Sequence, residues 1–435
     1  MALDPYFAPH EGGDGAFSLD PSAIKFGRGV LAEVGEDARA QGMTRAAVFA
    51  DPAVAKLAPV ATVTAALRAA GIDAVLYDEI VVEPTDRSFQ KATEFARDGR
   101  FDGFVSVGGG STMDTAKAAN LYSSWPADFM AYVNAPIGRA EPVPGPLKPH
   151  IACPTTFGTA SECTGIAICD FIDLEVKSGI ISRRLKPTLG VLDPSALATL
   201  PANVVAANAF DVLCHAIESL TARPYSKRPK PASATQRPLS QGANPYSDLA
   251  CLEAVRLAGH SLVRAVREPD AEDARESLMF SGMLAGIGFG NAGCHLPHGM
   301  SYAVAGLVRD YRAPDYPSNH AMVPHGISVV VNAPAVFRFT GPACPERHLR
   351  AADALGADTK GADSADGGAI LADRLAAMMR ETGLPNGLMG VGYGPEDIPA
   401  LTEGAWKQQR LIVNMPCALS KDQLASLFKD AMRYW

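Results

Sequence analysis

Residues 104–117 read FVSVGGGSTMDTAK, and this stretch decides the fold of the first half of the chain. The run at 104–107 predicts a short strand, three glycines follow it, and the residues after them favour a helix. Such glycines let backbone N–H groups approach a pyrophosphate closely, and a helix N-terminus favours its negative charge. The segment matches neither GxGxxG nor the Walker pattern, so a tight turn without a ligand stays open as an alternative.

On both sides of this loop, short β-like runs alternate with helical stretches. We expect strands at 45–50, 74–77, 104–107, 151–153 and 189–192, and helices at 60–70 and 88–97. Strands that alternate with helices indicate a parallel α/β sheet. The first half therefore predicts a dinucleotide-binding type of domain.

The character of the chain changes after Asp193-Pro194. Alanine- and leucine-rich stretches predict helices at 202–221, 247–267 and 274–287. We therefore predict two domains, an α/β domain over 1–198 and an all-α domain over 199–435. The polar, proline-rich residues 223–245 are expected to form a surface loop between two helices.

Bulk composition excludes several classes of function. A chain of 435 residues with a net charge of -8 indicates two soluble domains and argues against nucleic acid or an anionic membrane as partner. We see no long uncharged apolar stretch, and the N-terminus lacks the pattern of a signal or transit peptide. The eight cysteines form no CxxC pair, which fits a reducing compartment, so we expect a cytoplasmic protein.

Asp51 follows the first predicted strand, in the run Phe49-Ala50-Asp51-Pro52. A carboxylate there can hold the ribose diol of an adenosine and repel a 2′-phosphate, which would favour NAD over NADP. The alternative is an aspartate that caps a helix. The sequence leaves both interpretations open.

Asp211 and His215 lie four residues apart in a predicted helix, so they share one face. Such a pair alone is common and proves little. His298 and His325 each precede a glycine in apolar surroundings, and His295 is a rival to His298 as a ligand. One carboxylate with three imidazoles would suit Fe(II) or Zn(II).

Five segments, taken together, resemble the iron-containing (group III) alcohol dehydrogenases. They are GGGSTMDTAKA at 108–118, PTTFGTASE at 154–162, DVLCHAIES at 211–219, NAGCHLPHGM at 291–300 and PHG at 324–326. Within that family the chain is most similar to the hydroxyacid–oxoacid transhydrogenases. The pointers are VEPTDRSF at 82–89, KPTLGVLDP at 186–194, and the wide separation of His298 and His325.

The resemblance implies a dehydroquinate synthase-like fold, with the active site in a cleft between the two domains. It implies metal ligation by Asp211, His215, His298 and His325. It implies cofactor contacts by Asp51, Gly109, Gly110, Ser111, Asp114, Thr155, Thr156, Thr159 and Lys177. The implied cofactors are NAD and a divalent metal, Fe(II) in the first place and Zn(II) as the alternative. We also expect a homo-oligomer, most simply a dimer.

The chain departs from the family pattern at three positions. Phe157 stands where many members have a small residue and could narrow the nicotinamide pocket. Ala160 replaces a glycine, which predicts that no strongly positive φ is needed there. Tyr302 stands where many members carry a histidine four residues after the third ligand, so Tyr302 is our candidate for the proton relay.

The implied reaction is hydride transfer through bound NAD from 4-hydroxybutyrate to 2-oxoglutarate, giving succinate semialdehyde and 2-hydroxyglutarate. Carboxylate substrates call for a cationic anchor, and Arg309 and Arg312 are weak candidates. The alternative is an ordinary NAD-dependent alcohol or aldehyde dehydrogenase with an exchangeable cofactor. A dehydroquinate synthase-like lyase would need a basic cluster near the ligands, which the sequence does not display, and a non-catalytic binding protein would hold no metal.

Overall fold

The computed structural model describes residues 4–174, 176–316 and 321–435, and it divides into two compact units. One unit is Pro21–Thr199, which we call the α/β unit. The other combines Met1–Asp20 with Leu200–Trp435, and we call it the helical unit.

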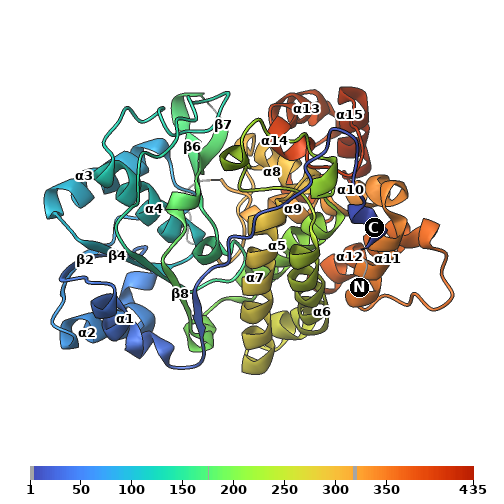
Figure 1. Ribbon diagram of the computed structural model, residues 1–435. Coiled ribbons are helices and arrows are strands. Elements are labelled where there is room, and N and C mark those ends of the chain that lie inside the picture. Colours follow the sequence, from blue (N-terminus) through green and yellow to red (C-terminus); the bar gives the residue numbers. More distant parts are fainter. Residues whose placement is uncertain (1–3, 175, 317–320) are drawn as a thin grey trace. The chain divides into compact units, whose positions relative to one another are not determined.

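The α/β unit is built on a six-stranded sheet whose paired strands are all parallel (Figure 1). Across the sheet the strands are β1 (Ile24–Phe26), β8 (Leu189–Leu192), β5 (His150–Pro154), β4 (Gly103–Gly108), β2 (Arg45–Phe49) and β3 (Asp73–Tyr77). The predicted parallel sheet is confirmed. The short edge strand β1 was not predicted, because three residues carry no measurable periodicity.

Helices cover both faces of this sheet, as Figure 1 shows. The four are α1 (Val34–Ala40), α2 (Ala58–Ala69), α3 (Asp86–Gly99) and α4 (Gly110–Ser124). Apolar side chains of α1 and α2 share one buried cluster with the sheet, and those of α3 and α4 share another on the opposite face. Burial on both faces explains why the strands read as continuous apolar runs.

The strand order places a topological switch point between β2 and β4. From β2 the chain moves to the edge strand β3, returns to β4 on the other side of β2, and continues outward to β5. In open parallel sheets, ligands bind beyond the carboxyl ends of the strands at such a point. Asp51 follows β2, and the glycine loop follows β4, so both lie at this edge.

A separate antiparallel pair, β6 (Ile166–Phe171) and β7 (Val176–Ile181), completes the α/β unit. The sequence analysis did not predict it. The pair contributes Asp170 and Lys177, which face each other in the strand register.

The helical unit contains the remaining α-helices. They are α5 (Ala202–Thr221), α6 (Pro245–Arg267), α7 (Glu272–Ala292), α8 (Leu296–Gly306), α9 (His325–Val330), α10 (Ala333–Thr340), α11 (Pro345–Ala354), α12 (Gly367–Glu381), α13 (Ile398–Trp406), α14 (Gln409–Ile412) and α15 (Lys421–Asp430). Helix α5 packs against α6, α7, α8, α9 and α11. It is the central helix of the unit.

Among the described residues, α5 is the one helix long and apolar enough to cross a membrane, with a mean hydropathy of 1.2. However, 94% of the most apolar stretch of α5 is buried inside the protein. The apolar character of α5 therefore reflects its central position, as in other helices buried on every side.

The N-terminal segment packs on the helical unit, so it departs from the predicted domain boundary of 1–198. The Tyr6 hydroxyl donates to the Ala222 carbonyl at 2.7 Å, and Arg237 pairs with Asp14 at 2.8 Å. These contacts join residues more than 200 positions apart, so no local sequence pattern could predict them. The partner loop at 223–245 is likewise only partly a surface loop, because Tyr225 N–H bonds the buried Ala243 carbonyl at 3.0 Å.

Candidate metal centre and cofactor loop

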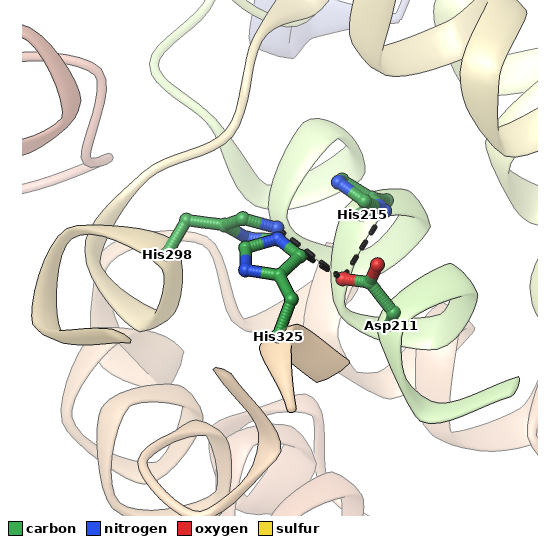
Figure 2. A group of neighbouring side chains, drawn as sticks. All are labelled: Asp211, His215, His298 and His325. Carbon is green, nitrogen blue, oxygen red and sulfur yellow. Dashed lines mark ion pairs between the residues drawn. The ribbon is translucent and has the colours of Figure 1, made fainter. Parts of the chain in front are cut away.

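Four side chains converge in the helical unit from three helices, as Figure 2 shows. Helix α5 supplies Asp211 and His215, α8 supplies His298, and His325 is the first residue of α9. One nitrogen or oxygen from each side chain lies within 4.8 Å of the corresponding atoms of the others. The structure thus brings together the four residues that the family resemblance implied as ligands.

The Asp211 carboxylate lies close to all three imidazoles. Its Oδ1 atom is 3.5 Å from His215 Nδ1, 3.5 Å from His298 Nε2 and 3.7 Å from His325 Nε2. The side chains of Asp211 and His298 are 2% and 7% exposed, but that of His325 is 32% exposed. His325 is therefore the most exposed of the four side chains, and the other three are buried.

The burial of these atoms tests whether a metal fits. Asp211 Oδ1, His215 Nδ1 and His298 Nε2 are all buried without a hydrogen-bond partner. An unpaired buried polar atom costs roughly 1–3 kcal/mol, so three facing one point would be expensive in a site without a ligand. A divalent cation satisfies all three, and an N/O donor set of this kind suits Fe(II) or Zn(II). The residues therefore fit the implied metal.

The protonation states of Asp211 and His215 agree with this fit. Burial raises the pKa of Asp211, but His215 and the other imidazoles outweigh burial and lower it to about 2. Burial lowers the pKa of His215 to about 3, against the attraction of Asp211. At neutral pH the aspartate is ionised and His215 is neutral, which are the forms that bind metals.

Glu218 received no role from the sequence, although it lies within the family segment DVLCHAIES. Glu218 Oε1 lies 2.6 Å from His298 Nδ1, and Glu218 is fully buried. Burial opposes a charge on His298, but Glu218 raises the pKa of that imidazole well above its ordinary value. The i, i+4, i+7 spacing of Asp211, His215 and Glu218 on α5 was the available signal.

His295, the rival ligand, has both ring nitrogens engaged elsewhere. Its Nδ1 accepts from the Leu296 N–H at 2.8 Å, and its Nε2 lies 3.0 Å from Thr221 Oγ1. His295 caps the N-terminus of α8 and does not belong to the group of four.

Tyr302 lies on α8 one turn after His298 and is partly exposed. Arg309, a candidate carboxylate anchor, is committed to a surface ion pair with Asp397 at 2.8 Å and to the Gly392 carbonyl. Arg312 is exposed. The structure therefore gives no support to either arginine as an anchor.

The glycine loop lies in the α/β unit, between the end of β4 and the start of α4. A Cβ atom on Gly110 would lie 2.8 Å from the Thr159 side chain, and one on Gly109 would lie 3.2 Å from Thr156. Thr155 N–H donates to the Gly108 carbonyl at 3.0 Å. The predicted glycines and threonines are thus adjacent, and the close approach explains why the loop needs glycine.

Glu83 contacts both Ser111 and Lys177, which are two further predicted cofactor residues. The Glu83 N–H donates to Ser111 Oγ at 3.2 Å, and Lys177 Nζ lies 2.8 Å from Glu83 Oε2 and 3.0 Å from Asp170 Oδ1. Burial opposes the charge of Lys177, but the two carboxylates raise its pKa. Lys177 is therefore cationic and fixed beside the loop.

Asp114 and Asp51 both have structural partners. Asp114 accepts from Ser161 Oγ at 2.6 Å and from the Ile168 N–H at 2.9 Å, inside the protein. Asp51 accepts from the N–H groups of Ala53 and Val54, each at 3.0 Å. Asp51 therefore caps the turn that follows it, as the alternative interpretation predicted. It lies at the same edge of the sheet as the glycine loop.

The prediction for Ala160 was wrong. Ala160 lies in the left-handed region, with φ 46° and ψ 38°, just before the 3₁₀ turn Ser161–Cys163. Its carbonyl accepts from the Cys163 N–H at 2.9 Å, so the turn fixes this backbone conformation. A missing glycine does not exclude a positive φ when the surrounding turn compensates for the strain.

Glu162 gives a pH-dependent prediction. Burial raises its pKa from 4.5 to about 7, so between these values the folded chain holds a proton that the unfolded chain releases. Stability therefore falls as the pH rises through this window. Glu162→Gln should remove that loss and stabilise the protein by about 2.5 kcal/mol more at pH 8 than at pH 5. Urea unfolding at the two pH values measures this, and an equal effect at both would contradict it.

The comparisons with known proteins cover both units. Residues 21–194 match the family model described as iron-containing alcohol dehydrogenase, and residues 234–432 match the C-terminal model of the Fe-containing alcohol dehydrogenase family. The crystal structure of 1,3-propanediol oxidoreductase has a TM-score of 0.83 at 27% identity, covering 96% of this chain and 100% of that one. The chain therefore belongs to the iron-containing alcohol dehydrogenase family and is an NAD- and metal-dependent oxidoreductase, as the resemblance implied.

Two relatives narrow the comparison. The hydroxyacid-oxoacid transhydrogenase, mitochondrial, of Xenopus laevis is 50% identical over 424 residues, which are 97% of this chain and 92% of the relative. The human protein of the same name is also 50% identical, over 97% of this chain and 91% of its own length. The expected cytoplasmic location was wrong by this comparison, because both relatives are named as mitochondrial. That expectation relied on the cysteine pattern and on the lack of a signal or transit pattern among the first residues.

Proposed function

We propose that this enzyme transfers hydride from 4-hydroxybutyrate to 2-oxoglutarate through NAD that stays bound, giving succinate semialdehyde and 2-hydroxyglutarate. The observation that carries the proposal is the group Asp211, His215, His298 and His325, in which three buried polar atoms face one point without a hydrogen-bond partner. Relatives that share half of their residues with the chain, and that are named transhydrogenases, support the choice of reaction.

The metal centre would use Asp211, His215, His298 and His325, with Fe(II) as the proposed metal and Zn(II) as the alternative. When bound there, the ion would supply Lewis acidity toward a hydroxyl or carbonyl oxygen. The exposed side at His325 is where we place the entry of substrate. Tyr302, one helical turn from His298, is our proposed proton relay.

The α/β unit would hold NAD. Gly109, Gly110 and Ser111 begin α4, so their N–H groups would bind the pyrophosphate. Asp51 would hold the adenosine ribose diol at the carboxyl end of β2. The other proposed contacts are Asp114, Thr155, Thr156, Thr159 and Lys177. Of these, Lys177 is the fixed cation beside the loop, and it would compensate the charge of the cofactor.

The decisive experiment measures coupled turnover without added NAD. Purified enzyme with 4-hydroxybutyrate and 2-oxoglutarate should form succinate semialdehyde and 2-hydroxyglutarate in equal amounts, and NAD should appear in solution after denaturation. Turnover that begins only when NAD is supplied would favour the alternative, an ordinary alcohol dehydrogenase with an exchangeable cofactor. We further propose a homodimer, for which light scattering on the eluted protein is the measurement.

A further inference from the structure

We propose that Glu218 is a positioning residue that fixes the tautomer and orientation of His298 for the metal. The inference rests on the proposed metal centre and extends it to a residue outside the four ligands. It concerns α5 and α8, which belong to the same unit.

Both oxygens of the Glu218 carboxylate are used. Oε1 lies 2.6 Å from His298 Nδ1, and Oε2 accepts from the His295 backbone N–H at 2.7 Å. The Glu218 side chain has 0% exposure. A buried carboxylate is expensive to maintain, so one that binds two groups on a single neighbouring helix indicates a specific task.

The first oxygen decides which ring nitrogen of His298 carries the proton. An imidazole that binds a metal through one nitrogen keeps a single N–H, and an ionised carboxylate can only accept, so that N–H is at Nδ1. The lone pair is then at Nε2, the atom 3.5 Å from Asp211 Oδ1. Glu218 therefore prepares the ring nitrogen that faces the other three ligands.

The second oxygen fixes where the ring stands. His295 is the N-cap of α8, and its N–H is bound by Glu218, while Thr221 on the same helix as Glu218 contacts the His295 ring at 3.0 Å. A negative charge at a helix N-terminus is also favourable. The first turn of α8, which carries His298, is thereby attached to α5, which carries Asp211 and His215.

Cys294 lies close enough that Glu218, Cys294 and His298 form a second possible group of ligands. A metal there would bind His298 through Nδ1. The 2.6 Å separation of Nδ1 from Glu218 is instead a hydrogen-bond length. The two interpretations predict different metal-bound nitrogens, so one measurement separates them.

The first test uses Glu218→Gln, which preserves size and removes one acceptor. The His295 N–H can only donate, so it keeps a hydrogen bond to the oxygen of the new amide. The NH₂ group of that amide then faces His298 Nδ1. The ring must accept there, which moves its proton to Nε2, where the metal would bind. We expect Zn(II) affinity, measured by chelator competition, to fall about 10- to 100-fold.

Ser219→Ala is the matched control for a buried hydrogen bond on α5. Ser219 Oγ donates to the Gly293 carbonyl at 3.1 Å, next to the α8 segment, without contacting a ligand. This variant should keep the Zn(II) affinity of the parent. Unchanged affinity in Glu218→Gln would overturn the inference, and so would an equal loss in both variants. Full metal binding by Asp211→Asn would instead overturn the proposed centre itself.

A second measurement needs no variant at Glu218. In the Zn(II)-loaded enzyme labelled with ¹⁵N-histidine, NMR should place the metal on Nε2 of His298 and a strongly hydrogen-bonded proton on Nδ1. Correlation of each ring with its own backbone assigns the His298 signal. Metal on Nδ1, or a proton on Nε2, would overturn the inference even if Glu218→Gln does not fold.

Discussion

Replacing His298 with alanine is expected to remove most of the bound metal and to lower kcat/KM about 1,000-fold or more. The reason is that the imidazole supplies one of four converging ligand atoms, and its loss leaves the buried Glu218 Oε1 atom without its partner. The ion's Lewis acidity contributes several kcal/mol to such reactions, and each 1.36 kcal/mol is tenfold in rate. His325→Ala should behave in the same way. Metal analysis of anaerobically purified protein and initial rates measure both effects.

His295→Ala is the control for losing a buried histidine from the same segment. Its ring bonds Leu296 and Thr221, so we expect this variant to lose stability and to keep its metal. Full metal occupancy in His298→Ala would refute the ligand assignment. A metal loss in His295→Ala as large as that in His298→Ala would show that the effect is unfolding.

Gly326→Ala is the second change for which we expect a large effect. A Cβ atom on Gly326 would lie 1.9 Å from the Ala207 carbonyl oxygen and 3.0 Å from Asp211 Cβ, both on α5. Backbone cannot yield as a flexible side chain can, so α9 must move away from α5 and take His325 with it. We expect a loss of about 2 kcal/mol in unfolding free energy and at least tenfold weaker metal binding.

Gly299→Ala is the matched control, because Gly299 also follows a proposed ligand, His298. A Cβ atom there would meet nothing closer than Leu411, at 3.5 Å, which is ordinary contact. Alanine is a better helix former than glycine, so we expect stability to rise by about 0.5–1 kcal/mol with the metal retained. Chelator competition and urea unfolding on both variants test the pair. If both variants had the same stability and the same metal affinity, close packing of α9 on α5 at Gly326 would not be the cause of the effect.

Several parts of the fold and site can be predicted from local sequence. The apolar periodicity of a strand or helix can be recognised within a short stretch of residues. The alternation of such strands and helices then predicts the parallel sheet. The glycines at 108–110 predict the turn between β4 and α4 for the same reason. Asp211 and His215 share a face of α5 because they lie one helical turn apart.

Other features depend on contacts between distant residues. Residues 4–20 pack on the helical unit through partners more than 200 residues away, so the predicted boundary missed them. Ala160 adopts a positive φ because a turn imposes it, and its own side chain gives no sign of this. Composition near the N-terminus likewise did not predict the mitochondrial naming of the relatives.

Local patterns in the sequence are enough to predict the two architectural classes, the glycine loop and one pair of proposed ligands on a single helix. The sequence also carries the family motifs that single out His298 and His325. The packing of the helices was needed to show that α8 and α9 bring these histidines to Asp211, and that both oxygens of Glu218 bind groups of α8. The physical reason is range. Helical periodicity fixes neighbours within a turn or two, whereas the Glu218–His298 contact joins residues 80 apart, which only the packing of complete helices can bring together.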